Sequence, residues 1–198
     1  LFGEMAASDQ DAALRPGPQR NIVLATNVAE TSVTIEGITA VVDSGMARIL
    51  QFNPHVGLDR LRRTSISKAS ADQRAGRAGR VRPGLCLRLW SEAAHRARPD
   101  QETPEIRRVD LSGPVLQLRC WGESDIAAFP WFEPPHAASL ARADRLLRQL
   151  GALDSSGPTE RGRRMSQLPV PPRMARLLLE GARRGVAEQA AMASPMLS

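Results

Sequence analysis

Residues 73–80 read QRAGRAGR and carry three arginines and two glycines within eight positions. Serines and small residues just upstream predict a helix that begins near Ala69. On such a helix Gln73, Arg77 and Arg80 stand at positions i, i+4 and i+7, which share one face. The sequence therefore predicts a helical face that combines one amide with two guanidinium groups.

The two glycines are unusual inside a helix. Gly76 and Gly79 each weaken it by about 1 kcal/mol relative to alanine, which indicates a backbone that something approaches closely. Arginines and an amide on an open surface suit a polyphosphate, because a planar guanidinium can bind two phosphate oxygens at once. A solvated basic face is the alternative interpretation of this stretch taken alone.

A second informative stretch, residues 22–37, reads IVLATNVAETSVTIEG. Its apolar start predicts a buried parallel strand over residues 21–25, with a polar segment at 26–34 following it. The carboxyl end of a strand in an open α/β sheet is the edge where ligands bind. Residues 39–43 predict the next buried strand, and the Asp-Ser-Gly at 43–45 is interpreted as structural.

The composition indicates a packed protein with an anionic partner. Apolar residues make up 42% of the 198, so a folded core is expected rather than disorder. The net charge is +6 and Lys68 is the single lysine, so the positive charge is almost entirely arginine; this favours nucleic acid as a partner.

Cys86 and Cys120 are expected to be reduced core residues of a cytoplasmic protein. No metal-binding pattern and no apolar run long enough to span a membrane are found.

Alternating residues within 47–67 flank an Asn/Pro/Gly turn and predict a β-hairpin. One arm carries Arg60, Arg62 and Arg63, which either protect a sheet edge or contact nucleic acid. Residues 84–90 predict a further strand whose leucines all face one way.

Beyond a polar, proline-containing linker at 99–104 the pattern becomes helical. The helices expected from residue 91 onward cover 91–98, 110–121, 137–150, 160–167, 173–185 and 186–197. A short hairpin is expected at 152–159. Three short helices together with this hairpin are typical of a winged-helix module.

The two stretches together resemble motifs V and VI of superfamily 2 helicases, and ATNVAETSVTIEG followed by QRAGRAGR is similar to the DEAH-box branch of RNA helicases. Residues 13–16, 36–37, 110–113 and 129–131 look most like the bacterial HrpB branch. The resemblance implies an α/β fold with three parts: a partial RecA-like parallel-sheet lobe at 1–98, a winged-helix domain at 99–168, and the start of an all-α ratchet domain at 169–198. No GxxxxGK[ST] phosphate loop occurs in the chain. We therefore expect the first RecA-like lobe to lie outside it and the chain alone to be inactive.

The resemblance also implies a site. Gln73 is expected to contact the γ-phosphate of ATP or its attacking water, and Arg77 and Arg80 are expected to act as arginine fingers. Glu36 is expected to reach the nucleotide ribose. ATP is expected with Mg²⁺, whose ligands belong to the first lobe, so no metal site is expected here. Arg74 points off the predicted face and is expected to pack or to form ion pairs.

RNA is the partner that the resemblance implies. Thr26 and Asn27 are expected to hold the RNA backbone, joined by Arg60 and Arg62 of the hairpin. Such contacts give sequence-independent, salt-dependent binding of single-stranded RNA. The function implied is an ATP-dependent RNA helicase or translocase, with the hairpin separating strands.

Two other functions stay open on the sequence alone. One is a winged-helix nucleic-acid-binding regulator without ATPase activity, whose recognition helix at 137–150 carries Arg142, Arg145 and Arg148. A strong base-sequence preference is the property that distinguishes it. The other is a non-catalytic interaction fragment.

Overall fold

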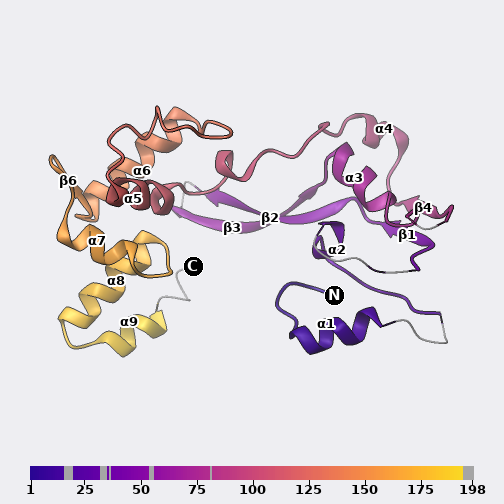
Figure 1. Cartoon of the computed structure of the whole chain (residues 1–198), viewed down its shortest axis with the longest axis horizontal. Helices are drawn as coiled ribbons and strands as arrows, with labels where there is room; N and C mark the ends of the chain where they lie inside the picture. Colours follow the sequence, from indigo (N-terminus) through magenta and orange to yellow (C-terminus); the bar gives the residue numbers. More distant parts are fainter. Residues whose placement is uncertain (16–19, 32–34, 36, 54–55, 81, 194–198) are drawn as a thin grey trace. The chain divides into compact units, whose positions relative to one another are not determined.

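The computed structural model describes residues 1–15, 20–31, 35, 37–53, 56–80 and 82–193, and of Thr31 the backbone alone. These residues form two compact units (Figure 1). The first contains residues 1–49 and 61–102, and the second contains residues 50–60 and 103–198. The chain therefore passes between the units three times, after residues 49, 60 and 102.

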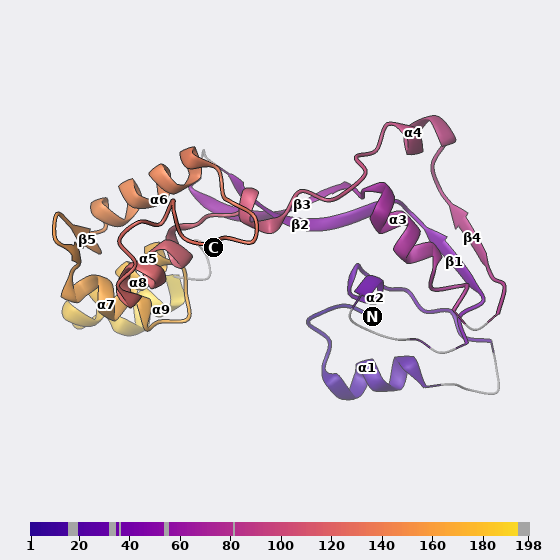
Figure 2. The ribbon, with the colours of Figure 1, turned by 45° about the horizontal axis from the view of Figure 1, so that its top comes forward.

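A short parallel sheet organises the first unit. Strand β1 (Ala40–Asp43) pairs with β4 (Leu85–Arg88), so that Ala40 lies opposite Leu85 and Asp43 opposite Arg88. Helix α3 (Lys68–Ala75) packs against β1, as Figure 2 shows. The unit also contains the helices α1 (Ala7–Leu14), α2 (Val28–Thr31) and α4 (Glu92–Arg96). The expected α/β fold with a parallel sheet is confirmed.

The buried strand expected over residues 21–25 is wrong. The structure has no strand there, and Ile22 and Leu24 are 85% and 82% exposed. The backbone of this segment bonds to the first residue of the chain: the Leu1 amino group donates to the Leu24 carbonyl at 2.6 Å, and the Thr26 N–H donates to the Leu1 carbonyl at 3.0 Å. The segment therefore satisfies backbone groups through Leu1 and forms no ladder with β1.

The sheet also differs from expectation in what it buries. Leu85 and Leu87 share one face of β4 as predicted, and Leu89 follows directly after the strand, but all three are exposed. Val42 of β1 is exposed too, and Asp43 is the only fully buried residue of that strand. Strand β1 was expected to be buried because a parallel sheet is normally covered on both faces.

Helix α3 starts where the sequence predicts and ends earlier. The Ser67 hydroxyl caps it by accepting the Ser70 N–H at 3.1 Å. The helix ends at Ala75, with Gly76 as its C-cap. Arg77 therefore lies in a tight turn after the helix, where its N–H bonds to the Arg74 carbonyl three residues back. The expectation that one helical face carries Gln73, Arg77 and Arg80 is wrong, because the two glycines end the helix.

The predicted hairpin is confirmed as β2 (Met46–Asn53) and β3 (Leu58–Ser65). Its tip, residues 50–60, belongs to the second unit. There the Phe52 N–H donates to the Arg108 carbonyl at 2.7 Å, and the Asp110 N–H donates to Asp59 Oδ1 at 2.9 Å. The guanidinium of Arg142 lies 4.5 Å from the Phe52 ring centre. The tip is thus packed into this unit.

The rest of the second unit is mostly helical (Figure 2). Its elements are η1 (Glu105–Arg107), α5 (Ser112–Trp121), α6 (Ala137–Gln149), β5 (Leu153–Asp154), β6 (Gly157–Pro158), α7 (Glu160–Ser166), α8 (Pro172–Arg183) and α9 (Ala187–Ala193). Helix α5 packs against α6 and α7, and α8 packs against α7 and α9. A continuous apolar core includes Val115, Leu116, Leu147 and Met165. Trp121 is exposed, because it sits in the last turn of α5, just before the left-handed Gly122.

We expect Leu147→Ala to destabilise the second unit by about 2–5 kcal/mol, because the substitution leaves a cavity in a fully buried site. Amide hydrogen exchange in α5 and α6 measures this loss. Leu61→Ala is the matched control, since Leu61 is exposed. Equal protection in both variants would contradict the placement of Leu147 in the core.

The pKa of Asp59 is raised above its ordinary value, chiefly by burial and also by the neighbouring carboxylates of Asp110 and Glu105. The folded state therefore holds this proton more tightly than the unfolded chain, so stability falls as pH rises through the window just above the ordinary aspartate pKa. Asp59→Asn keeps an acceptor for the Asp110 N–H and removes this decline. Its melting temperature should therefore gain on that of the unsubstituted protein as pH rises through that window.

Asp100 is the control of opposite sign, because the Lys68 ammonium lowers the pKa of that carboxyl. Asp100→Asn should lose stability relative to the unsubstituted protein as pH rises through the window just below the ordinary aspartate pKa. If both variants gained stability with rising pH relative to the unsubstituted protein, or both lost it, a raised pKa of buried Asp59 would be ruled out as the cause of the difference.

Candidate functional site

Arg74 is the centre of a polar network between α2, α3 and the end of β1. Its Nε bonds to Glu30 Oε2 and its Nη1 to Asp43 Oδ1, each at 2.9 Å. Nη1 also donates to the Met46 carbonyl at 3.1 Å. The side chains of Arg74, Glu30 and Asp43 are only 14%, 16% and 2% exposed. The expectation that Arg74 forms ion pairs is confirmed.

Glu30 is held by three side chains from one stretch of the chain. Its Oε1 accepts the Ser70 hydroxyl at 2.6 Å and its Oε2 accepts Arg74. Its main-chain carbonyl accepts two N–H groups of Arg77, from Nε at 3.1 Å and from Nη2. Carbonyls in the last turn of a helix lack partners within it, and here a planar guanidinium supplies the donors.

A second set of contacts, made by Gly45 and Arg98, holds the turn that follows β1. The Gly45 N–H donates to Asp43 Oδ1 at 2.8 Å. Arg98 donates to the carbonyls of Gly45 and Ile66 at 3.0 and 2.7 Å, and its guanidinium lies 4.3 Å from the Trp90 ring centre. A Cβ on Gly45 would meet the Trp90 ring and the Arg98 guanidinium at less than 3.0 Å. Asp43 is therefore presented to Arg74 by a tightly packed turn, in agreement with the structural interpretation of residues 43–45.

A cavity of about 290 Å³ opens beside this network within the first unit. Two groups of predicted site residues meet in its lining: two of the proposed RNA contacts, Thr26 and Asn27, and one proposed arginine finger, Arg77. The polar residues that carry the argument are Thr26, Asn27, Glu30, Asp43, Arg74 and Arg77. The Thr26 and Asn27 carbonyls accept the N–H groups of Ala29 and Glu30, so Thr26 and Asn27 belong to the turn that opens α2.

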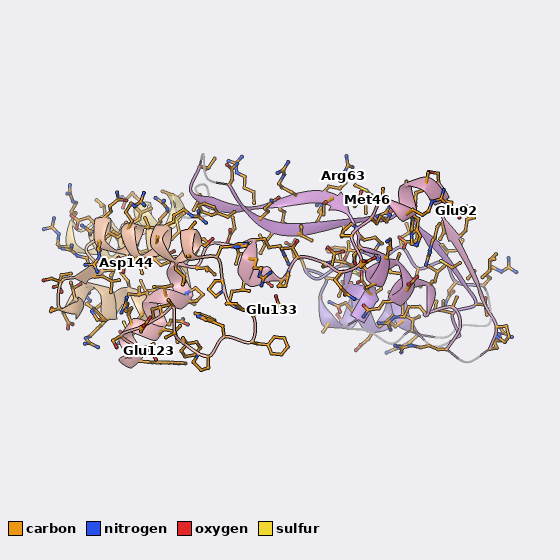
Figure 3. All side chains as sticks on the ribbon, turned by 90° about the horizontal axis from the view of Figure 1, so that it is seen from above. Met46, Arg63, Glu92, Glu123, Glu133 and Asp144 are labelled. Carbon is orange, nitrogen blue, oxygen red and sulfur yellow. The ribbon has the colours of Figure 1, made fainter. Side chains whose placement is uncertain are left out.

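The other predicted residues lie elsewhere. Gln73 and Arg80 are exposed and do not line this cavity. Arg60 and Arg62 are exposed on β3, next to Arg63, which projects outward from the hairpin in Figure 3. Glu36 lies outside the described residues. The structure thus brings Thr26 and Asn27 together with Arg77, whereas Gln73 and Arg80 are exposed outside this cavity.

Sequence reasoning missed Glu30 and Ser70 as parts of the site. The available signal was charge: Glu30 is the single acid within the stretch ATNVAETSVTI, and Arg74 was expected to find an ion pair. A buried arginine requires a nearby carboxylate, so Glu30 could have been predicted as the ion-pair partner of Arg74. Ser70 gave no signal beyond its place near the start of α3.

Helix α6 differs from a basic recognition helix because most of its arginines are bonded within its own unit. Arg148 pairs with Asp144 at 2.7 Å, and Arg142 stacks on Phe52 and donates to the Ser139 hydroxyl. Two of its three arginines are thus engaged within the unit. This counts against the winged-helix regulator.

Among the described residues no cluster of three or more histidine, cysteine or acidic side chains could hold a metal ion. In the same part of the chain, no helix has the length and apolar character needed to cross a bilayer. Cys86 and Cys120 are free thiols and are half-buried, less enclosed than the core positions expected for them.

Comparison with known proteins places the chain among helicases. Residues 1–82 match the helicase conserved C-terminal domain. The chain is 42% identical to the ATP-dependent RNA helicase HrpA of Escherichia coli, over 100% of the chain and 16% of HrpA. It is 46% identical to the ATP-dependent RNA helicase HrpB of the same organism, over 90% of the chain and 22% of HrpB. A crystal structure of the E. coli DEAH/RHA helicase HrpB superposes with a TM-score of 0.89 at 42% identity, covering all of this chain and 25% of that one. The resemblance to the DEAH-box branch is confirmed, and the chain spans about a fifth of the length of these relatives.

We expect Arg74→Met to destabilise the packing of α2 on α3 by about 3–5 kcal/mol, because it leaves two carboxylates of low exposure without a cation. Amide hydrogen exchange in α3 reports the loss. Arg96→Met is the matched control: Arg96 pairs with Glu92 on the exposed surface of α4 and is 68% exposed. That change should cost no more than about 0.5 kcal/mol. Similar losses in the two variants would show that the network around Arg74 contributes no more than a surface pair.

Proposed function

Since this chain belongs to the helicase family that includes HrpA and HrpB, we propose that it forms part of an ATP-dependent RNA helicase of the DEAH-box type. The observation that carries the proposal is the cavity at which Thr26 and Asn27 meet Arg77. A residue suited to RNA phosphates and a residue suited to ATP phosphates then lie in one small unit.

The proposed activity belongs to the whole protein that contains this chain. The chain has no phosphate loop of the GxxxxGK[ST] type. A partner lobe must therefore supply the groups that hold most of the ATP and the Mg²⁺ ligands. The groups that this chain brings are guanidinium and amide donors, which fit the phosphates and not the metal.

Arg77 acts in this proposal as an arginine finger. Phosphoryl transfer spreads negative charge over the oxygens of the transferred group, and a planar cation delivered across a cleft stabilises that charge. Arg80 is proposed as a second finger, and Gln73 as the residue that contacts the γ-phosphate or orients the attacking water. Both are exposed and are therefore accessible to a second lobe. Glu36 is proposed to contact the ribose.

The RNA contacts proposed are Thr26, Asn27, Arg60 and Arg62. All four are exposed, and their hydroxyl, amide and guanidinium groups suit phosphate oxygens rather than base edges. Single-stranded RNA is then bound without sequence preference and more weakly at high salt. Hydrolysis moves the lobes, and the segment at residues 26–27 moves with the lobe that carries it.

We also propose the finer organisation: a second RecA-like lobe at 1–98, a winged-helix domain at 99–168 and the start of a ratchet domain at 169–198. The cytoplasm is the proposed location, where the reduced thiols of Cys86 and Cys120 are stable.

The test is RNA-stimulated ATP turnover by the whole protein. Arg77→Ala is expected to lower the RNA-stimulated rate by about 10³- to 10⁵-fold, the usual cost of losing an arginine finger. RNA affinity measured without nucleotide should stay within about twofold, because Arg77 contacts phosphate of ATP and not of RNA. Arg96→Ala, on the exposed face of α4, is the control and should leave turnover unchanged. Unchanged turnover in Arg77→Ala would refute its catalytic role.

A further inference from the structure

We propose that Glu30 is a positioning residue that couples the RNA-contacting turn to the arginine finger Arg77. The inference rests on the proposed function and adds to it a residue that contacts neither RNA nor ATP. Its basis is the convergence of Ser70, Arg74 and Arg77 on this one residue.

The side chain of Glu30 fastens α2 to α3. Both carboxylate oxygens are used, one by the Ser70 hydroxyl and the other by Arg74 Nε. Arg74 is in turn fixed to the sheet through Asp43. At the low exposure of these groups the bonds are charge-assisted and poorly screened. Helix α2 has only four residues and cannot be stable alone, so this attachment sets its position.

The main chain of Glu30 orients Arg77. Two N–H groups on one edge of the guanidinium point at the Glu30 carbonyl, which fixes the plane of the ion. A planar cation needs the correct plane to meet the oxygens of a transferring phosphoryl group. A shift of the Glu30 carbonyl therefore turns Arg77.

The same residue is joined to the RNA side. The Glu30 N–H donates to the Asn27 carbonyl at 2.9 Å, and the Ala29 N–H donates to the Thr26 carbonyl at 3.2 Å. Because these bonds lie within a single turn of backbone, a displacement of Thr26 and Asn27 by RNA also moves Glu30. Glu30 thus stands between RNA contact and finger orientation.

The experiment compares ATP turnover with and without RNA in the whole protein carrying Glu30→Gln. Glutamine keeps the length and one acceptor oxygen but removes the charge that holds Arg74. The RNA-stimulated kcat should fall about 10- to 100-fold, the cost of misplacing a catalytic group by about 1 Å. RNA affinity without nucleotide should change by less than about threefold, and the rate without RNA should fall by a smaller factor than the stimulated rate. A general structural defect, by contrast, lowers both rates by the same factor.

Two further variants keep the test decisive. Glu92→Gln makes the same chemical change in an exposed pair and should leave the ratio of stimulated to unstimulated rates unchanged. If Glu30→Gln fails to fold, the Ser70→Ala variant tests the proposal instead. It removes the hydroxyl bond to Glu30 and retains the ion pair of Glu30 with Arg74. It should lower the same ratio by a smaller factor.

The outcomes separate the two proposals. If the unsubstituted protein shows no RNA-stimulated turnover, the proposed function fails. If it does, and Glu30→Gln or the folded Ser70→Ala variant is stimulated as strongly as the unsubstituted protein, the coupling role of Glu30 is refuted while the helicase function stands.

Discussion

The ion pairs of Arg74 with Glu30 and Asp43 are the interaction on which the first unit depends. Among its described residues the fully buried apolar side chains are only Ile66, Ala71 and Ala78. Buried polar residues such as Asp43 and Ser70 are as numerous. A unit with so little apolar burial gains little from the hydrophobic effect. Its elements are placed by directional contacts, and Arg74 contributes contacts to α2, β1 and the start of β2 at once.

This dependence has a cost in stability and a benefit in geometry. A paired buried charge seldom adds much net stability, because desolvation offsets its attraction. It does demand one arrangement of its partners, since any other leaves a charge unpaired. In this chain that arrangement brings the turn at residues 26–27 and the guanidinium of Arg77 to one cavity. The proposed chemistry needs orientation more than affinity, and an ionic network supplies orientation.

The elements set by local sequence could be predicted, and those set by distant partners could not. The hairpin β2–β3, the helix α6 and the cap of α3 at Ser67 follow from turn residues, periodicity and a side-chain cap, and all were found as expected. The segment at residues 21–25 has the composition of a strand, but a strand needs a neighbour, and its backbone bonds to Leu1 instead. The helix face through Gln73, Arg77 and Arg80 is absent because the helix ends at Ala75, before the two glycines that weaken it. The ion pairs of Arg74 were predicted in kind, but their partners lie 44 and 31 residues away, beyond the reach of any local pattern.

The three passages of the chain between its units bear on how such proteins can be rearranged in evolution. The hairpin tip is contributed by residues 50–60, yet its partners Arg108, Asp110 and Arg142 come from the second unit. A recombination junction placed in the linker near residue 102 would therefore join a tip from one parent to a binding surface from another. A hybrid would be well packed only if the hairpin tip of one parent fits the second-unit surface of the other. The second unit is inherited as two separate pieces of sequence, residues 50–60 and 103–198.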